Sequence, residues 1–455
     1  MSFQALISAR SIRRLALAVA LSLTPSLLPG VALASTGALT PLGCVADPVN
    51  NPDTCGQTAK GLDTAFSAAV SRDGRSVYVV GAADNAIVRF KRDSTTGALT
   101  PRGCVADVTN DPDGCALTAK GLMNPQMVAI SRDGTSVYVV GGVGTIVRFA
   151  RDTKTGALVP KGCTGDKGNN PSGCAKVAKG MGGADAVAVS PDGRSVYVAA
   201  YDDETIVRFD RDRTTGALTA RGCIAERGYN PAGCAQTIIG GLQEPYIGSV
   251  TVSPDGTSVY AAGSAGPSIA MFRRTSTGAL KPRGCIADPA NNPESCVLTA
   301  KGLANPYRVV VSPDGASVYA ADYLASGVVR FTRDLSTGSL KGKGCVADPA
   351  HDTVGCAQTA PGLYGTEWVA ISADGRSVYA TGTNASAIVR FARDRTTGAL
   401  TPKGCIGDVV NNPSNCVMTA KGLSNVQSLA LSADGTSLYA PSPLDNSITR
   451  FRRAT

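Results

Sequence analysis

Short apolar runs alternate with polar, turn-forming segments along most of the chain. The copy at 186–225 has four such runs, AVAVS, SVYVAA, TIVRFD and ALTARGCIA, separated by PDGR, YDDE and RDRTTG. The runs are rich in β-branched and aromatic residues, lack a helical period and are bounded by glycine, proline or aspartate. This pattern is typical of short strands joined by tight turns, so it predicts four antiparallel strands in each unit.

The unit recurs seven times. The phrase Thr-Gly-Ala-Leu, or a close variant, returns every 59–62 residues and begins at Thr36, Thr96, Thr155, Thr215, Thr277, Thr337 and Thr397. No linker or change of composition separates the copies. Seven four-stranded units of equal length predict an all-β fold, a seven-bladed β-propeller of four-stranded antiparallel blades. We assign 35–455 to this single domain.

The two ends of the repeat array are incomplete in complementary ways. The N-terminal copy supplies only a fourth strand, at 37–47, and the C-terminal copy stops after a third strand, at 447–452. An unpaired sheet edge is a liability for a soluble protein. We therefore expect the N-terminal strand to complete the last blade and close the ring.

Every repeat carries two cysteines separated by ten residues. The pairs are Cys44 and Cys55, Cys104 and Cys115, Cys163 and Cys174, Cys223 and Cys234, Cys285 and Cys296, Cys345 and Cys356, and Cys405 and Cys416. A bridge within each repeat is the simplest connectivity. Metal binding is the alternative, but zinc sites use more closely spaced pairs, and the one histidine, His351, lies in an expected turn between two of these cysteines. We expect no catalytic role for it.

The first 34 residues have the pattern of an export signal. Arg10, Arg13 and Arg14 precede a short apolar core at 15–23, and the small-residue pattern ending at Ala34 predicts cleavage there. A retained membrane anchor is the alternative reading, although the apolar core is too short to span a bilayer. An exported chain favours disulfide bonds, so we expect a secreted or extracytoplasmic protein, in the periplasm or cell envelope.

The small net charge of the chain argues against one class of partner, nucleic acids. The chain has 44 basic and 35 acidic residues, and removing the three arginines of the N-terminal segment leaves 41 against 35, an excess of six. No basic run is interleaved with aromatic residues as in single-strand nucleic-acid binders. We therefore expect no nucleic-acid partner, no membrane span and a monomer.

Two motifs resemble a known family. The segment 187–199, VAVSPDGRSVYVA, and the segment 206–219, IVRFDRDRTTGALT, resemble the lactonase-like seven-bladed propellers, which include the 6-phosphogluconolactonase-type and YVTN-type proteins. The resemblance extends blade by blade over 35–455. It implies the propeller fold and, as one activity, hydrolysis of a sugar lactone at the mouth of the central channel.

The channel mouth is where propellers usually bind small molecules, so we consider the residues that enter the innermost strands there. These are Phe66, Gln126, Asp185, Tyr246, Tyr307, Arg308, Glu367, Trp368 and Gln427. Glu367 and Arg308 are the catalytic candidates, as a base and a holder of an anionic group. Trp368, the only tryptophan, could stack on a sugar. The alternative is a structural Arg308–Glu367 pair with Trp368 packed between blades.

Two acidic patterns complete the candidate chemistry. Asp202, Asp203 and Glu204 form a weak calcium candidate, although an acidic loop is more commonly just solvated, and we expect no other cofactor. An acid also follows the first cysteine of every pair by three residues: Asp47, Asp107, Asp166, Glu226, Asp288, Asp348 and Asp408. Such strict repetition predicts a structural role in the disulfide loops.

Two functions remain open on the sequence. The favoured hypothesis is a ligand-binding or cell-envelope scaffold module that takes a small molecule, glycan or protein on the face that carries the disulfide loops, where the copies differ most. The alternative is a lactonase-like hydrolase acting on a sugar lactone. The sequence leaves open whether the protein is an enzyme.

Overall fold

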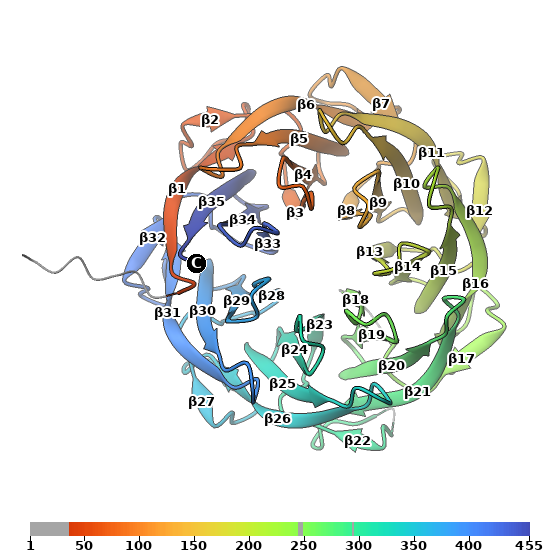
Figure 1. Cartoon of the computed structure of the whole chain (residues 1–455), viewed down its shortest axis with the longest axis vertical. Coiled ribbons are helices and arrows are strands. Elements are labelled where there is room, and N and C mark those ends of the chain that lie inside the picture. Colours follow the sequence, from red (N-terminus) through yellow and green to blue (C-terminus); the bar gives the residue numbers. More distant parts are fainter. Residues whose placement is uncertain (1–35, 244–248, 294) are drawn as a thin grey trace, which may run out of the picture. The chain divides into compact units, whose positions relative to one another are not determined.

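Each repeat folds into one small sheet, and seven sheets stand in a ring around a common axis (Figure 1). The structure is a computed structural model and describes residues 36–243, 249–293 and 295–455. The expected export signal at 1–34 lies outside these residues. Ser35–Thr455 group into one compact unit. The prediction of an all-β, seven-bladed propeller is confirmed.

The blades are numbered along the chain from the first complete one. Blade 1 contains β3 (Ala65–Val70), β4 (Ser76–Gly81), β5 (Ala86–Arg92), β6 (Leu99–Asp107) and β7 (Leu117–Ala119). Blade 2 contains β8 (Pro125–Ile130), β9 (Ser136–Gly141), β10 (Thr145–Arg151), β11 (Leu158–Asp166) and β12 (Lys176–Ala178). Blade 3 contains β13 (Ala184–Val189), β14 (Ser195–Ala200), β15 (Thr205–Arg211), β16 (Leu218–Glu226) and β17 (Gln236–Ile238). Blade 4 contains β18 (Ser249–Val252), β19 (Ser258–Gly263), β20 (Ser268–Arg274), β21 (Leu280–Ala287) and β22 (Leu298–Thr299).

The remaining blades follow the same order. Blade 5 contains β23 (Pro306–Val311), β24 (Ser317–Asp322), β25 (Gly327–Arg333), β26 (Leu340–Ala347) and β27 (Gln358–Thr359). Blade 6 contains β28 (Val369–Ile371), β29 (Ser377–Gly382), β30 (Ala387–Arg393), β31 (Leu400–Asp408) and β32 (Met418–Ala420). Blade 7 contains β33 (Ala430–Leu431), β34 (Ser437–Ser442), β35 (Ser447–Arg453), β1 (Leu39–Ala46) and β2 (Gln57–Thr58).

A short fifth strand extends every blade beyond the four predicted antiparallel strands. In blade 1 the sheet order is β3-β4-β5-β6-β7, and β7 pairs with β6 in parallel, with Val105 opposite Leu117. The sequence pattern does not reveal these strands because each has only two or three residues. The loop between the paired cysteines returns the chain alongside the fourth strand and so creates the pairing.

The N-terminal strand completes the last blade, as predicted. β1 pairs with β35 in antiparallel register, from Leu39 opposite Arg453 to Ala46 opposite Ser447. The strand order in blade 7 is β2-β1-β35-β34-β33, and the red and blue ends of the chain lie side by side in Figure 1. Backbone hydrogen bonds between the two ends of the chain therefore close the ring.

All seven cysteine pairs form disulfides within their own repeats, which confirms the predicted connectivity. The Cα atoms of each pair are 5.1–5.3 Å apart, and no cysteine among the described residues is free. The bonds join Cys44 to Cys55, Cys104 to Cys115, Cys163 to Cys174, Cys223 to Cys234, Cys285 to Cys296, Cys345 to Cys356, and Cys405 to Cys416. No thiol of the described part is available as a metal ligand or nucleophile.

The two cysteines of a pair belong to different parts of the blade. The first lies in the fourth strand, whereas the second lies in the loop just before the short fifth strand. These loop cysteines are Cys55, Cys115, Cys174, Cys234, Cys296, Cys356 and Cys416. Each disulfide therefore ties the returning loop to the outer strand of its own blade.

Neighbouring blades are held together by a buried latch of arginine, tyrosine and aspartate. In one copy, Arg151 Nε donates to Tyr78 Oη at 2.8 Å, and Arg151 pairs with Asp73 at 2.9 Å. Tyr78 Oη in turn donates to the carbonyl of Gly156 at 2.6 Å. The other arginines of this latch are Arg92, Arg211, Arg274, Arg333, Arg393 and Arg453. The latches use the β-turns of the face opposite the disulfide loops, and these turns are the most uniform part of the repeat.

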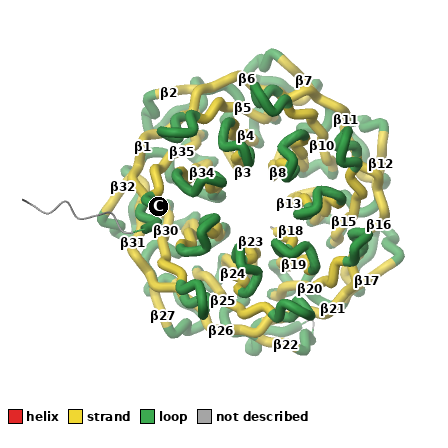
Figure 2. Tube along the Cα trace, in the orientation of Figure 1, coloured by secondary structure: helices red, strands yellow, loops and turns green. Residues whose placement is uncertain are grey.

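Strands and loops alternate around the whole ring, and the described residues contain no helix (Figure 2). Consequently none of the described residues belongs to a helix long and apolar enough to cross a membrane. The loops that connect the second and third strands lie next to the disulfide loops. In blade 1, for example, Asp84 of the loop between β4 and β5 lies beside Asp113 of the disulfide loop. These two sets of loops therefore share one face, called here the disulfide-loop face.

Candidate functional site

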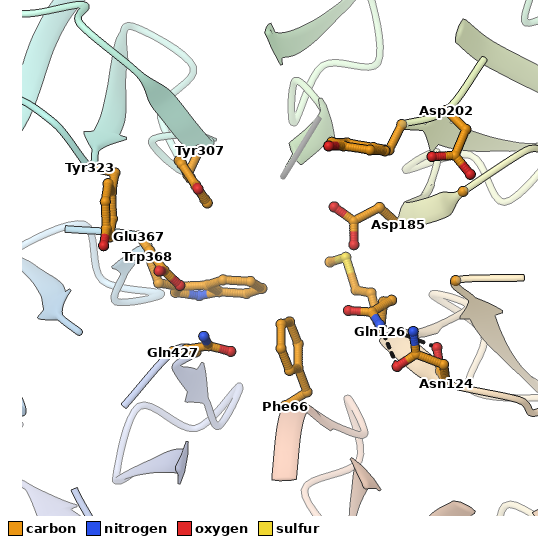
Figure 3. A pocket seen from close by; sticks show the side chains of 14 residues that line it. Phe66, Asn124, Gln126, Asp185, Asp202, Tyr307, Tyr323, Glu367, Trp368 and Gln427 are labelled. Atoms are coloured by element: carbon orange, nitrogen blue, oxygen red, sulfur yellow. Dashed lines mark hydrogen bonds between the residues drawn. The ribbon is translucent and has the colours of Figure 1, made fainter. Parts of the chain in front are cut away.

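A cavity of about 800 Å³ opens where the innermost strands reach the disulfide-loop face (Figure 3). We call it the axial cavity. Inner-strand residues of blades 1, 2, 3, 5, 6 and 7 meet there. Its lining consists of Phe66, Asn124, Gln126, Met127, Gly142, Gly183, Asp185, Tyr201, Asp202, Tyr307, Tyr323, Glu367, Trp368 and Gln427. Its size suits a small organic ligand.

Two carboxyl groups from well-separated blades face this cavity. Asp185 belongs to β13 of blade 3, and Glu367 precedes β28 of blade 6. Figure 3 shows both side chains projecting into the cavity from different sides. Burial raises the pKa of Asp185 to about 7. Burial also raises the pKa of Glu367 to about 7, with a further increase from the charge of Asp185 and a decrease from the Thr383 hydroxyl. Both groups therefore titrate near neutral pH.

Arg308 stacks on Trp368 and does not pair with Glu367. Its guanidinium carbon lies 3.8 Å from the centroid of the Trp368 ring, and its Nη1 lies 3.6 Å from Met127 Sδ, across the ring in blade 2. Burial lowers its pKa to about 10, and its Nε has no hydrogen-bond partner within the described residues. The structural alternative predicted from the sequence, an ion pair between Arg308 and Glu367, is not among the ion pairs of the described residues. A guanidinium over an aromatic face is a favourable contact, and here it joins the indole to Met127 on the other side of the ring.

The Trp368 ring is fixed in position and offers a face to the cavity. Its Nε1 donates to the Leu429 carbonyl at 3.1 Å, and its backbone amide donates to Thr381 Oγ1 at 3.0 Å. In Figure 3 the indole extends toward the middle of the cavity, close to Phe66. The Tyr307 ring lies 5.5 Å from the Tyr323 ring in a tilted arrangement. The aromatic wall is therefore built from blades 1, 5 and 6.

Amide side chains provide hydrogen-bonding groups between the aromatic and acidic walls. Gln126 Nε2 donates to Asn124 Oδ1 at 2.8 Å. This hydrogen bond orients the Gln126 amide so that its Oε1 faces the cavity (Figure 3). Gln427 Oε1 is buried without a partner among the described residues. Buried polar atoms normally have a hydrogen-bond partner, so the Gln427 oxygen marks a place for a donor group of a ligand.

The structure brings most of the sequence candidates together. Phe66, Gln126, Asp185, Tyr307, Glu367, Trp368 and Gln427 line the axial cavity. Arg308 is not among the lining residues but contacts two of them, Trp368 and Met127, and Tyr246 falls outside the described residues. His351 instead hydrogen-bonds to Asp348 at 3.0 Å and stacks on Tyr364 in its disulfide loop.

The disulfides take no direct part in this site. None of the fourteen cysteines is among the residues that line the axial cavity. The first cysteines lie in the fourth strands, away from the innermost ones, and the second cysteines, Cys174, Cys296, Cys356 and Cys416 among them, lie in the outer loops. The disulfides therefore tie loops at the outer edge of the disulfide-loop face and do not form part of the cavity wall.

The acidic loop of blade 3 is divided between different environments. Asp202 is exposed at the rim of the axial cavity, whereas Asp203 Oδ2 accepts the Gly182 amide at 2.8 Å. Glu204 is buried and its backbone has a φ of 50°. The groups of three acids close enough to share an ion in the described part lie elsewhere. A calcium site in this loop stays a prediction.

Sequence reasoning missed the residues that reach the cavity from loops. Asn124, Tyr201 and Tyr323 stand next to inner strands or in the loops between the second and third strands, and Met127 follows a bulge between Pro125 and Met127 in β8. The variation of these loops from copy to copy was the available signal. Their convergence depends on how seven blades close into a ring.

Comparison with known proteins gives the fold. A scan against family models and a search of curated proteins found no match. Among solved structures, a candidate 6-phosphogluconolactonase of Bacteroides uniformis is 18% identical with a TM-score of 0.51, covering 74% of this chain and 83% of that one. The chain shares the fold of the lactonase-like propellers. A periplasmic gluconolactonase of Pseudomonas aeruginosa is 15% identical with a TM-score of 0.52, covering 82% and 93%.

The same comparison finds the fold in a protein whose name describes a different activity. Hydrazine synthase of Kuenenia stuttgartiensis is 17% identical with a TM-score of 0.52, covering 87% of this chain and 97% of that one. At such identities the likeness extends to the fold alone. Function has to be argued from the residues of the axial cavity.

Proposed function

We propose that the protein binds a small, uncharged, polyhydroxylated ring, a sugar or a sugar lactone, in the axial cavity. The observation that carries the proposal is the pair of carboxyl groups, Asp185 and Glu367, which share one cavity with the face of Trp368 and titrate near neutral pH. Carboxyl groups and amides exchange hydrogen bonds with hydroxyls, and an indole face packs on the apolar face of a sugar ring.

The charges of the cavity argue against a phosphorylated ligand. Its lining includes three acids, Asp185, Asp202 and Glu367, and no basic residue. The nearby guanidinium of Arg308 is already covered by Trp368. A phosphate dianion would meet carboxylates without a facing Lys or Arg, and such an arrangement is repulsive. An uncharged ring avoids this cost.

An extracytoplasmic location fits the same proposal. Seven disulfides consume all fourteen cysteines, and such bonds persist in oxidising compartments. The pattern of residues 1–34 adds an independent reason, and one structural neighbour is a periplasmic gluconolactonase. We infer that the chain works outside the cytoplasm.

Tryptophan fluorescence tests ligand binding directly, because Trp368 is the only tryptophan in the chain. The disulfide-bonded protein is titrated with D-glucose, D-glucono-1,5-lactone, D-gluconate and 6-phosphogluconate. We expect a saturable change with an uncharged compound, lost in Asp185→Asn and retained in Asp202→Asn at the exposed rim. Absence of a saturable change with every uncharged compound, or preference for the phosphorylated acid, would refute the proposal.

Lactone hydrolysis is the second candidate, favoured by the shared titration range of Asp185 and Glu367. A pair holding one proton could act as base and acid. The ionised carboxylate would take a proton from water while the water oxygen bonds to the lactone carbonyl carbon. The ring C–O bond would break and the ring oxygen would take the proton of the other carboxyl, leaving the pair with one proton as before.

The two candidates differ in turnover. Release of acid from D-glucono-1,5-lactone is followed in a pH-stat and corrected for spontaneous hydrolysis. Catalysis predicts a rate that peaks near pH 7 and falls roughly 100-fold or more in both Asp185→Asn and Glu367→Gln. Saturable fluorescence without excess turnover would assign a binding protein.

A further inference from the structure

Two groups of three aspartates lie on the disulfide-loop face, outside the axial cavity. Within each group, the carboxylate oxygens are within 4.8 Å of one another. The first triad is Asp47, Asp84 and Asp113, and the second triad is Asp408, Asp445 and Asp53. The two triads occupy equivalent positions in successive blades. Each combines the acid that follows a fourth strand with two acids of the next blade, one from the loop between its second and third strands and one from its disulfide loop.

The first of these acids normally caps backbone amides. In blade 1, Asp107 Oδ1 accepts the Thr109 amide at 2.9 Å, while Oδ2 accepts the amides of Gly121 at 3.0 Å and Leu122 at 2.9 Å. Both oxygens are therefore used in holding the chain that leads into the next blade. This confirms the structural role that the repetition predicted for the acid.

Asp47 departs from this arrangement. Its Oδ1 accepts the Val49 amide at 2.8 Å, but the Gly61 amide donates to Asp113 Oδ2 at 2.6 Å instead. Asp47 Oδ2 is left without a hydrogen-bond partner in the described part of the chain, although the residue is only 2% exposed. Asp47 thus combines a buried, unpartnered carboxylate oxygen with a carboxylate oxygen within 4.8 Å of those of Asp84 and Asp113.

The second triad is buried at all three positions. The amide of Gly422 donates to Asp53 Oδ2 at 2.6 Å, and the amide of Ser424 donates to Asp445 Oδ2 at 2.6 Å. Asp408 is fully buried, and its Oδ2 accepts one amide, that of Leu423, at 3.0 Å. A carboxylate offers about four lone-pair positions, so each group retains capacity for another partner.

The protein does not neutralise these carboxylates with side-chain ion pairs among the residues that the structure covers. Lys60 Nζ donates to the backbone carbonyl of Asp113, and Lys421 Nζ donates to Thr54 Oγ1. Acids that lie this close together, with at least two of the three buried, require either added protons or a bound cation.

We propose that each triad binds one calcium ion. The donors are all carboxylate oxygens, which suit a hard cation, and calcium places its oxygen ligands at about 2.3–2.6 Å. In each triad, one oxygen from each aspartate lies within 4.8 Å of the other two, so a single ion could contact all three. Backbone carbonyls and water would complete the usual six to eight ligands.

The repeats themselves indicate specialisation. Only blades 1 and 7 carry aspartate both in the loop between the second and third strands and in the disulfide loop. The residues at these two positions in the other blades are Val143 and Ser172, Asp203 and Ala232, Gly266 and Glu294, Ala325 and Val354, and Ala385 and Ser414. The two aspartates therefore occur together, as expected of residues that share an ion.

The position of the triads suggests what calcium would do. Blade 7 is assembled from both ends of the chain, with β1 paired to β35 (Figure 1). The second triad joins this blade to blade 6, and the first triad joins it to blade 1. The loop closed by Cys44 and Cys55 supplies one ligand to each triad, Asp47 and Asp53. Calcium would thus fasten the ring-closing blade to both of its neighbours.

Calorimetric titration with CaCl₂ tests the sites in the purified, disulfide-bonded full chain after removal of metal with EGTA. We expect two ions per chain, one in Asp113→Ser, one in Asp53→Ser and none in the double variant. Serine already occupies these positions as Ser172 and Ser414, so the loops should tolerate it. Asp84→Asn is a second, isosteric variant of the first triad. Asp111→Asn should leave two ions, because Asp111 lies outside the triads and asparagine already makes the same hydrogen bond as Asn51 and Asn170.

Hydrogen exchange gives a second measurement. EGTA should speed amide exchange in β1 and β35 and leave blade 4 unchanged. Several outcomes would overturn the proposal: no calcium bound by the wild-type chain, two ions still bound by the double variant, loss of an ion in Asp111→Asn, or tighter binding of magnesium than of calcium. A carboxyl C=O infrared band that excess calcium leaves unchanged in the wild type but that the double variant lacks would show that shared protons, not an ion, neutralise the triads.

Discussion

Glu367→Gln should stabilise the protein at alkaline pH while weakening its ligand site. Glu367 has a pKa of about 7 in the folded chain against an ordinary value of 4.5. The folded state therefore binds this proton more tightly than the unfolded state. The resulting stability is fully present below pH 4.5 and is lost as the pH rises toward 7.

The difference between these pKa values corresponds to about 3 kcal/mol in the free energy of unfolding. Glutamine has nearly the same shape but cannot ionise, so the variant escapes this loss. We expect Glu367→Gln to exceed the wild type by about 2–3 kcal/mol at pH 8.5 and to match it near pH 4.

Guanidinium-chloride unfolding of both proteins at several pH values, with disulfides intact, measures the effect. Asp202→Asn is the control, because Asp202 is exposed at the rim of the same cavity, and its stability difference from wild type should not vary with pH. A variant that matches the wild type at both pH values, or is less stable at pH 8.5, would contradict the reasoning. The second result would mean that the ionised carboxylate has a favourable partner, such as Arg308.

Three further predictions concern the framework. Arg333→Ala removes a buried guanidinium that bonds to Tyr260, Gly315, Asp255, Thr257 and Ser258; it should cost about 3–5 kcal/mol in unfolding free energy, whereas Arg213→Ala, in an exposed turn, should change it little. Partial burial opposes ionisation of Asp255, but hydrogen bonds from Ser253, Thr257 and Arg333 outweigh it and lower its pKa to about 2. The stability that ionised Asp255 contributes should therefore be present above pH 4 and be lost between pH 4 and 2, by about 1 kcal/mol after allowing for solvent screening. Acid unfolding of Asp255→Asn should lack this loss. Replacing Cys104 and Cys115 by serine should lower the free energy of unfolding by about 3 kcal/mol under the chain-entropy model and leave the circular dichroism of the sheets unchanged. Loss of the whole fold would contradict the view that each disulfide stabilises only its own loop.

The blades could be predicted from the sequence because their determinants are local. Alternating apolar residues, turn glycines and the constant spacing of Cys104 and Cys115 lie within one repeat, and each hairpin pairs neighbouring strands. The incomplete first and last copies likewise predicted that β1 joins β35, since only one partner remained for each edge. The fifth strands escaped prediction, because two or three residues carry no periodic signal and pair only where the disulfide loop places them.

The functional sites were decided by tertiary structure. The sequence placed Arg308, Glu367 and Trp368 at the channel mouth, but only the packed ring turned the guanidinium onto the indole and toward Met127 of blade 2. It also brought Asp185 opposite Glu367, and Asp47 against two acids of the next blade. These contacts join residues from different blades, and the angle at which seven twisted sheets close sets which side chains meet. The repeat thus determines the ring, whereas the closure of the ring determines the cavity and the triads.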